Sequence, residues 1–156
     1  ANKFMRGKIN ARSETIHTTW PWKLAWRQSC VMIANGFCEP HKEGGEGLYM
    51  LPDHPTFAIP ALWDSFSGDD GKGNQMSIET VVMLTTDANA LVASNRTGRM
   101  RQPVVITDVE GIERFCSHEV TEHSQIADLF APWPDDQMTM EHVPKKPKAS
   151  PQKELF

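Results

Sequence analysis

Several features that mark particular protein classes are scarce or missing in this chain. Its 156 residues include only three cysteines, Cys30, Cys38 and Cys116, which form no CxxC pair. An odd, unpaired set argues against a disulfide framework and favours a reducing compartment. No apolar run approaches the length of a membrane span, and the N-terminus lacks the apolar core of an export signal. We therefore expect a cytoplasmic protein that does not enter a membrane, built without internal repeats.

The length and the charge of the chain indicate how many domains it has and whether it binds nucleic acid. A chain of 156 residues suits one domain with a real core. The net charge of -4 argues weakly against a general nucleic-acid binder. The basic residues are segregated, however: Lys3, Arg6, Lys8, Arg12, Lys23 and Arg27 near the start, Arg96, Arg99 and Arg101 in the middle, and Lys145, Lys146, Lys148 and Lys153 near the end. This distribution predicts either a basic groove on an acidic body or solvated surface charge without a groove.

Short apolar runs separated by turn residues predict an α+β fold with a mixed β-sheet and short flanking helices. The expected strands are residues 30–34, 48–51, 56–62, 77–85 and 103–106, with an extended segment at 8–12, a turn at 41–47 and a flexible hairpin tip at 67–75. Short helices are expected within 17–28, at 87–94 with Asp87 as N-cap, at 109–115 and at 120–129. The domain should span residues 1–143, followed by a Pro/Lys-rich tail at 144–156.

Four short motifs follow one another along the chain: Asn10-Ala11-Arg12-Ser13-Glu14-Thr15, Ala34-Asn35-Gly36-Phe37-Cys38-Glu39, Ala61-Leu62-Trp63-Asp64 and Thr85-Thr86-Asp87-Ala88-Asn89. In this order they resemble the SOS-response-associated peptidase (SRAP) family, whose members act on abasic sites in single-stranded DNA. The resemblance covers roughly residues 8–143, the back part of a full-length member. It therefore implies a partly barrel-like sheet that is incomplete at its N-terminal side.

In that family, the thiol and α-amine of an N-terminal cysteine capture the abasic-site aldehyde as a thiazolidine, which crosslinks protein to DNA; the peptidase activity is self-processing at the N-terminus. The resemblance implies that Asn10 orients the sugar and Glu39 transfers protons. It places phosphate contacts at Arg12 and Thr86. Arg96 and Arg99, in the middle basic cluster, are further DNA-binding candidates because of their charge. Neither a cofactor nor a metal is implied. The expected partner is single-stranded or junction DNA with an abasic site, in the nucleoid of a bacterial or phage-infected cell.

Two departures from the family pattern affect the expected chemistry. The printed chain begins with Ala1 rather than the family's Cys-Gly-Arg, so as written it should not form the thiazolidine. Arg96 stands where the family has a histidine, and an arginine stays protonated and cannot shuttle a proton. Three alternatives follow: a nucleophile supplied by another chain or by preceding residues, a non-catalytic DNA-binding module of phage type, or a truncated product with little function.

Other candidate groups are weaker. Cys38 as a substitute nucleophile is disfavoured because the neighbouring Glu39 should raise its thiol pKa. His118 and His123 are five residues apart, whereas the zinc histidines of an HExxH motif are four apart. The resemblance places His142 near the site. The tryptophans Trp20, Trp22 and Trp26 could form a base-stacking platform, although core packing is the commoner role at this spacing.

The chain ends in Gln152-Lys153-Glu154-Leu155-Phe156. This segment resembles the short Gln-x-x-Leu-Phe peptide with which bacterial replication proteins bind the sliding clamp, and a proline-tethered tail suits such docking. Family members also end in a segment that packs on their own domain, so both roles stay open.

Overall fold

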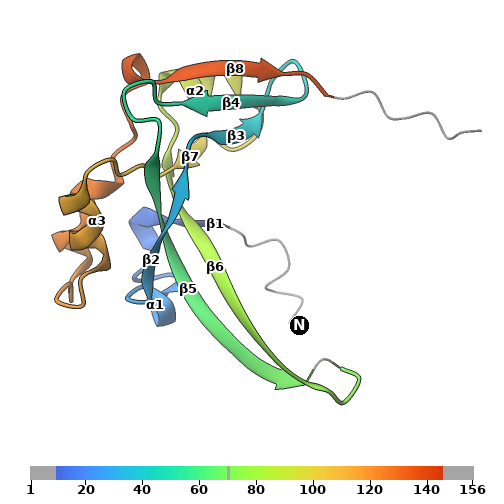
Figure 1. The fold of residues 1–156 in the computed structure, drawn as a ribbon, viewed down its shortest axis with the longest axis vertical. Coiled ribbons are helices and arrows are strands. Elements are labelled where there is room, and N and C mark those ends of the chain that lie inside the picture. The colour runs from blue at the N-terminus through green and yellow to red at the C-terminus, as the bar shows by residue number, and fades with distance from the viewer. Residues whose placement is uncertain (1–9, 70, 146–156) are drawn as a thin grey trace, which may run out of the picture.

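The strands form two open sheets in this computed structural model, which describes residues 10–69 and 71–145 (Figure 1). The larger sheet has the order β1 (Asn10–Arg12), β6 (Gln75–Asp87), β5 (Phe57–Asp69) and β2 (Ser29–Ala34), with β7 (Arg101–Pro103) also paired to β6. The smaller sheet has the order β3 (Phe37–Pro40), β4 (Glu46–Met50) and β8 (Thr139–Val143). The predicted α+β class is confirmed.

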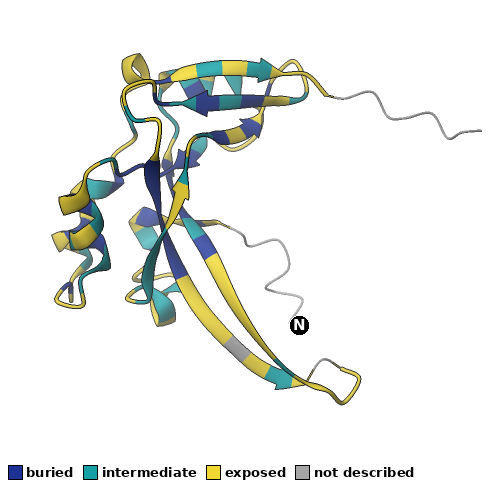
Figure 2. Ribbon diagram, viewed as in Figure 1, coloured by how far each residue is buried: buried dark blue, intermediate teal, exposed yellow. Residues whose placement is uncertain are grey.

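The longest element is the antiparallel β5–β6 hairpin, which extends away from the rest of the fold (Figure 1). Its register runs from Ala61 opposite Met83 to Asp69 opposite Gln75. Pairing therefore continues well into residues 67–75, and the prediction of a flexible loop over that range was wrong in its extent. The turn is tightened by the Asp69 carboxylate, whose Oδ1 accepts a hydrogen bond from the Gly71 amide at 2.6 Å. The outer half of the hairpin is largely exposed (Figure 2).

Apolar side chains gather in two clusters, one associated with each sheet. The first joins β1, β5 and β6 to α3 (Val109–Cys116) and includes Leu62, Leu84 and Phe115. The second lies around β4 and includes Tyr49, whose ring stacks on Phe37 with centroids 5.1 Å apart. The second cluster also contains Phe57 and Ile59 of β5, so it joins the two sheets and brings β3 close to the sheet that holds β1 and β6.

Helices are short; one predicted helix is absent, and another has a different N-cap from the one predicted. α1 covers only Trp22–Ala25. α2 covers Ala90–Asn95, and its N-cap is Asn89, whose side chain accepts a hydrogen bond from the Val92 amide at 2.9 Å. Asp87 instead ends β6, so the prediction of Asp87 as N-cap was wrong. The predicted helix at 120–129 is replaced by 3-10 turns at His123–Gln125 and Ala127–Phe130, with a further one at Asp135–Gln137 and one at Ser13–Thr15.

The helix α3 was predicted correctly, because Asp108 caps it and its apolar residues face one side. Two edge elements, β3 and β8, were not predicted. No helix within the described part of the chain is long and apolar enough to cross a membrane.

Candidate nucleic-acid interface

Parallel pairing of β1 with β6 creates the setting of the predicted site. Asn10 lies opposite Met83 and Arg12 opposite Thr85 in this pairing. Two further bonds fix the start of the chain to β6: the Ser13 hydroxyl donates to the Thr85 carbonyl at 3.1 Å, and the Thr85 hydroxyl donates to the Ala11 carbonyl at 3.2 Å. The first motif is therefore anchored to the fourth by hydrogen bonds in both directions.

A small pocket of about 90 Å³ opens beside this junction, and we call it the arginine pocket. Its lining residues come from β1, β3, β6, β7 and the segment after α2: Asn10, Arg12, Glu39, Thr85, Arg96, Arg99 and Arg101. Five of the six predicted site residues are thus brought together. The sixth, Thr86, does not line the pocket; it is 4% exposed and pairs with Gln102 across β6 and β7.

The predicted catalytic carboxylate, Glu39, is held by an ion pair with Arg96. The Glu39 Oε2 and Arg96 Nη2 atoms are 2.8 Å apart, and the two side chains are only 11% and 13% exposed. Burial raises the pKa of the Glu39 carboxyl, and the neighbouring Arg96 charge opposes that rise. The other terminal nitrogen of Arg96, Nη1, donates to the Arg101 carbonyl. Glu39 is therefore fixed by a permanent cation at the position where the family has histidine.

The Arg101 side chain holds β6, β7 and the turn after β1 together, and the sequence pattern did not single it out. Its Nη1 donates to the Asp87 Oδ1 at 2.7 Å, and the two nitrogens contact the Glu14 carboxylate at 2.9 and 2.8 Å. Nη2 also donates to the Thr85 carbonyl. Such a bidentate, charge-assisted contact is among the stronger side-chain interactions. The acidic Glu14 within the first motif is a sequence signal for a basic partner, but it does not say which arginine fills that role.

Two arginines remain without a counter-charge at the pocket. Arg12 and Arg99 are both exposed, and neither makes an ion pair or a side-chain hydrogen bond within the described ranges 10–69 and 71–145. Arg96 and Arg101 are already neutralised by carboxylates. The pocket therefore presents its positive charge through Arg12 and Arg99, beside the exposed amide of Asn10.

The other predicted candidates lie elsewhere. Cys38 is exposed, and its thiol pKa is raised by partial burial and by Glu46 and Glu39, which is the opposite of an activated thiolate. His123 contacts the Ser13 carbonyl through Nε2 at 2.7 Å and is not grouped with His118. Trp22 and Trp26 pack against the first apolar cluster, and Trp20 is 49% exposed. Gln152 to Phe156 lie outside the described residues.

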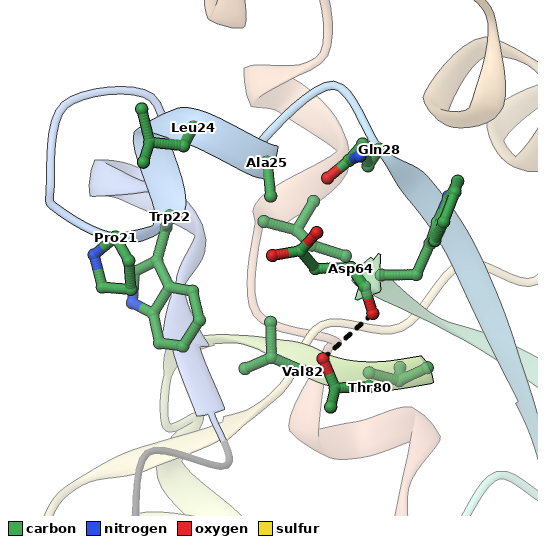
Figure 3. Close-up of a pocket in the computed structure, with 11 residues that line it drawn as sticks. Pro21, Trp22, Leu24, Ala25, Gln28, Asp64, Thr80 and Val82 are labelled. Carbon is green, nitrogen blue, oxygen red and sulfur yellow. Dashed lines mark hydrogen bonds between the residues drawn. The ribbon is translucent and has the colours of Figure 1, made fainter. Parts of the chain in front are cut away.

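A second, larger cavity lies where α1 faces the β5–β6 hairpin, and we call it the tryptophan groove (Figure 3). It encloses about 460 Å³ and is lined by Pro21, Trp22, Leu24, Ala25, Gln28, Leu62, Trp63, Asp64, Thr80, Val81 and Val82. The only hydrogen bond drawn there joins the Thr80 hydroxyl to the Asp64 carbonyl at 3.1 Å. The groove offers no cation to a phosphate, so it differs in chemistry from the arginine pocket.

Three of the four motifs contribute residues to the arginine pocket, and the chain as a whole can now be compared with known proteins. The model of the family described as "SOS response associated peptidase (SRAP)" matches residues 1–148. This chain belongs to the SRAP family. The resemblance inferred from the motifs is confirmed, and the description of the family connects its members with the SOS response.

Solved structures support the fold. A protein from Bacteroides thetaiotaomicron matches at a TM-score of 0.72 with 22% identity, over 86% of this SRAP chain and 57% of its own. A protein from Bordetella bronchiseptica matches at 0.70 with 24% identity, over 86% of this chain and 64% of its own. This SRAP chain therefore spans less than two thirds of either neighbour. No curated protein matches the chain.

Proposed function

We propose that this SRAP protein binds single-stranded DNA at abasic sites, with the DNA backbone seated on the arginine pocket. The observation that carries the proposal is the pairing pattern of the four arginines. Two of them, Arg96 and Arg101, are held by carboxylates, whereas Arg12 and Arg99 are exposed and uncompensated. A guanidinium that lines a pocket and is not neutralised by a carboxylate is well suited to a phosphate.

Asn10 and Glu39 supply the local recognition of the sugar in this proposal. The Asn10 amide can donate to and accept from a ring-opened deoxyribose, whose aldehyde and hydroxyl need both. Glu39 lines the same pocket, and its contact with Arg96 keeps it available as an acceptor. Proton transfer through the position of Arg96 is not part of the proposal, because an arginine stays protonated.

Binding to an abasic site and covalent crosslinking to it are separate steps, and one experiment distinguishes them. The chain is incubated with single-stranded DNA carrying one abasic site and analysed on native and denaturing gels. Undamaged strands and duplexes of equal length serve as competitors. A native shift that prefers the abasic strand supports the binding proposal, and a denaturing-stable adduct that Asn10→Ala or Glu39→Gln removes supports crosslinking at this pocket. Glu119→Gln, an exposed carboxylate outside the pocket, is the matched control.

The binding proposal fails if undamaged duplex competes as well as the abasic strand, or if no shift forms at low salt. Binding without an adduct instead supports the alternative of a non-catalytic DNA-binding module.

A sliding clamp is a second proposed partner, supported by the C-terminal Gln152-Lys153-Glu154-Leu155-Phe156 segment. Two apolar anchors after a glutamine fit a peptide-binding groove. A bacterial clamp should retain the full chain on a column and release it when Leu155 and Phe156 are changed to alanine. Equal retention of both chains would contradict this contact.

A further inference from the structure

Two histidines that are distant in sequence face each other at the end of the smaller sheet. His41 follows β3 directly, and His142 lies on β8 opposite Gly47. Their rings stack with centroids 4.1 Å apart and an interplanar angle of 27°. Glu43 joins them, so that one ligand atom from each of the three residues lies within 4.8 Å of the others. Their spacing along the chain, 41, 43 and 142, matches no sequence motif for a metal site.

We propose that His41, Glu43 and His142 form a binding site for a divalent transition-metal ion, with Zn²⁺ as the first candidate. Two imidazoles and one carboxylate are a donor set that zinc accepts, with a fourth position left to water. The proposal goes beyond DNA binding and does not depend on it, because none of the three residues lines the arginine pocket.

The hydrogen bond of His142 supports a ligand role. Its Nε2 lies 2.7 Å from the Gly44 carbonyl oxygen. A carbonyl only accepts, so Nε2 must carry the proton and the lone pair of Nδ1 stays free. A histidine that donates its second ring nitrogen to a backbone carbonyl is the usual arrangement around a bound metal, because that bond fixes both tautomer and ring orientation.

His41 needs a modest adjustment before it can coordinate. Its Nδ1 accepts a hydrogen bond from the Glu43 amide at 3.2 Å. Coordination through Nδ1 displaces this bond, and coordination through Nε2 moves the ring proton. Either change is small because the bond is long and the amide lies in an exposed turn, where water replaces the partner.

The turn that carries these ligands is held firmly against β8. Gly45 has a φ of 76°, and a Cβ atom there would lie 2.2 Å from the Val143 carbonyl oxygen. Only glycine fits both the conformation and the contact. His41 is 6% exposed, whereas Glu43 is exposed. One ligand is therefore anchored in the fold, and an ion can enter from solvent beside Glu43.

A metal at this site would fix the segment that holds Glu39. His41 lies two residues after Glu39 and forms an isolated bridge with Arg96. The following residue, Lys42, donates its amide to the Asn95 carbonyl at 2.8 Å. Metal binding should thus stabilise the end of β3, the turn and β8 as one unit.

The test uses the full-length chain without a histidine tag, stripped with EDTA and dialysed. Titration with Zn²⁺ by calorimetry, and with Co²⁺ by absorption spectroscopy, should give one equivalent and nitrogen–oxygen-type d–d bands. Both His142→Gln and Glu43→Gln should weaken binding by at least about tenfold. Gln at position 142 retains a donor for the Gly44 carbonyl, and equal melting temperatures of both variants and wild type in EDTA would establish intact folding. The matched control, His118→Gln, removes an exposed histidine outside the cluster and should bind as wild type.

Zn²⁺ should also raise the melting temperature of the wild type and of His118→Gln, but not that of His142→Gln. Three results would overturn the proposal. They are equal affinity of wild type and His142→Gln, no binding at about 100 μM Zn²⁺ (which puts the dissociation constant above that of protein sites of this type), and a thiolate charge-transfer band that assigns the ion to a cysteine.

Discussion

The arginine pocket and the tryptophan groove both use β6, but the strand is supported differently at the two places. At Met83–Asp87 it pairs with β1 and β7, so backbone partners hold the residues that frame the pocket. Along Gln75–Val82 the described partner is β5 alone. The pocket is accordingly built from ion pairs on a fixed backbone, whereas the groove depends on apolar side chains such as Trp22 and Val81, which is 54% exposed.

This contrast assigns different roles to charge and to apolar surface. Ion pairs between buried partners contribute little net stability, but removing one partner is costly. Apolar contacts contribute in proportion to the area that they bury. Variants in the pocket should therefore separate into those that carry structure and those that carry binding, while variants in the groove should affect stability alone.

The largest effect is expected from Arg101→Ala. This change leaves the Thr85 carbonyl and the carboxylates of Glu14 and Asp87 without their shared donor. Because Glu14 is 44% exposed and can regain water, we expect a loss of about 2–3 kcal/mol rather than the full cost of a broken buried pair. Urea denaturation measures it. Arg114→Ala, which breaks a more exposed pair with Asp128, should cost less than about 1 kcal/mol. Equal losses for both variants would remove the special role of Arg101.

Trp22→Ala should have the next largest effect. Trp22 lines the groove and packs against the first apolar cluster, so we expect about 2 kcal/mol less stability from lost burial. Leu24→Ala, at a residue that is 74% exposed on the same helix, should change stability by less than about 0.5 kcal/mol. Affinity for single-stranded DNA should not change in either variant. A matching loss of affinity in Trp22→Ala would mean that the groove binds bases after all.

Arg12→Ala and Arg99→Ala should weaken DNA binding and leave stability nearly unchanged, the reverse of what is expected for Trp22→Ala. Neither side chain pairs within the described residues, so stability should stay within about 0.5 kcal/mol of wild type. Each change should weaken single-stranded DNA binding by about tenfold and reduce the slope of affinity against salt by about one. Fluorescence anisotropy over a salt series measures both quantities. Lys23→Ala removes an equal charge from α1 and should leave the slope unchanged.

The smallest effect concerns how stability depends on pH through the ring pair of His17 and His123. His17 stacks on His123 with centroids 4.2 Å apart, and the pKa of His17 is lowered, first by burial and then by the His123 charge. The unfolded chain thus binds a proton more readily, so this stability is present above pH about 6.5 and is lost as the pH falls below it. His17→Gln should flatten that decline, by about 1–2 °C in Tm because the ring is largely solvated. An unchanged pH profile would exclude this pair as its source.

The strongest local signals were read correctly from the sequence. Residues 30–34 and 77–85 became parts of β2 and β6, because β-branched and apolar residues there fit a sheet. The short helix predicted at residues 109–115 is α3, and the structure shows that Asp108 caps it. The edge strands β3 and β8 were missed because their structure depends on pairing with β4 rather than on their own pattern. Residues 120–129 have helix-forming composition, but Ile126 and Phe130 are buried by 3-10 turns instead.

The candidate site was predicted only in part. Asn10, Arg12 and Glu39, which were assigned through the resemblance, line one pocket together with Arg96 and Arg99, which were chosen for their charge. The contacts of Arg101 could not be foreseen, since Glu14 and Asp87 reach it only when β1, β6 and β7 pair. The grouping of His41 with His142 likewise depends on the pairing of β4 with β8.

Arg96 reaches back to the main chain of Arg101, while the Arg101 side chain reaches across to Glu14. The short loop between the two arginines, with Gly98 at a φ of 84°, therefore sets the distance between them. Inserting or deleting a residue there would shift both guanidinium groups together and release Glu39 at the same time. The length of this loop therefore matters to the pocket as well as the identity of the side chains that line it.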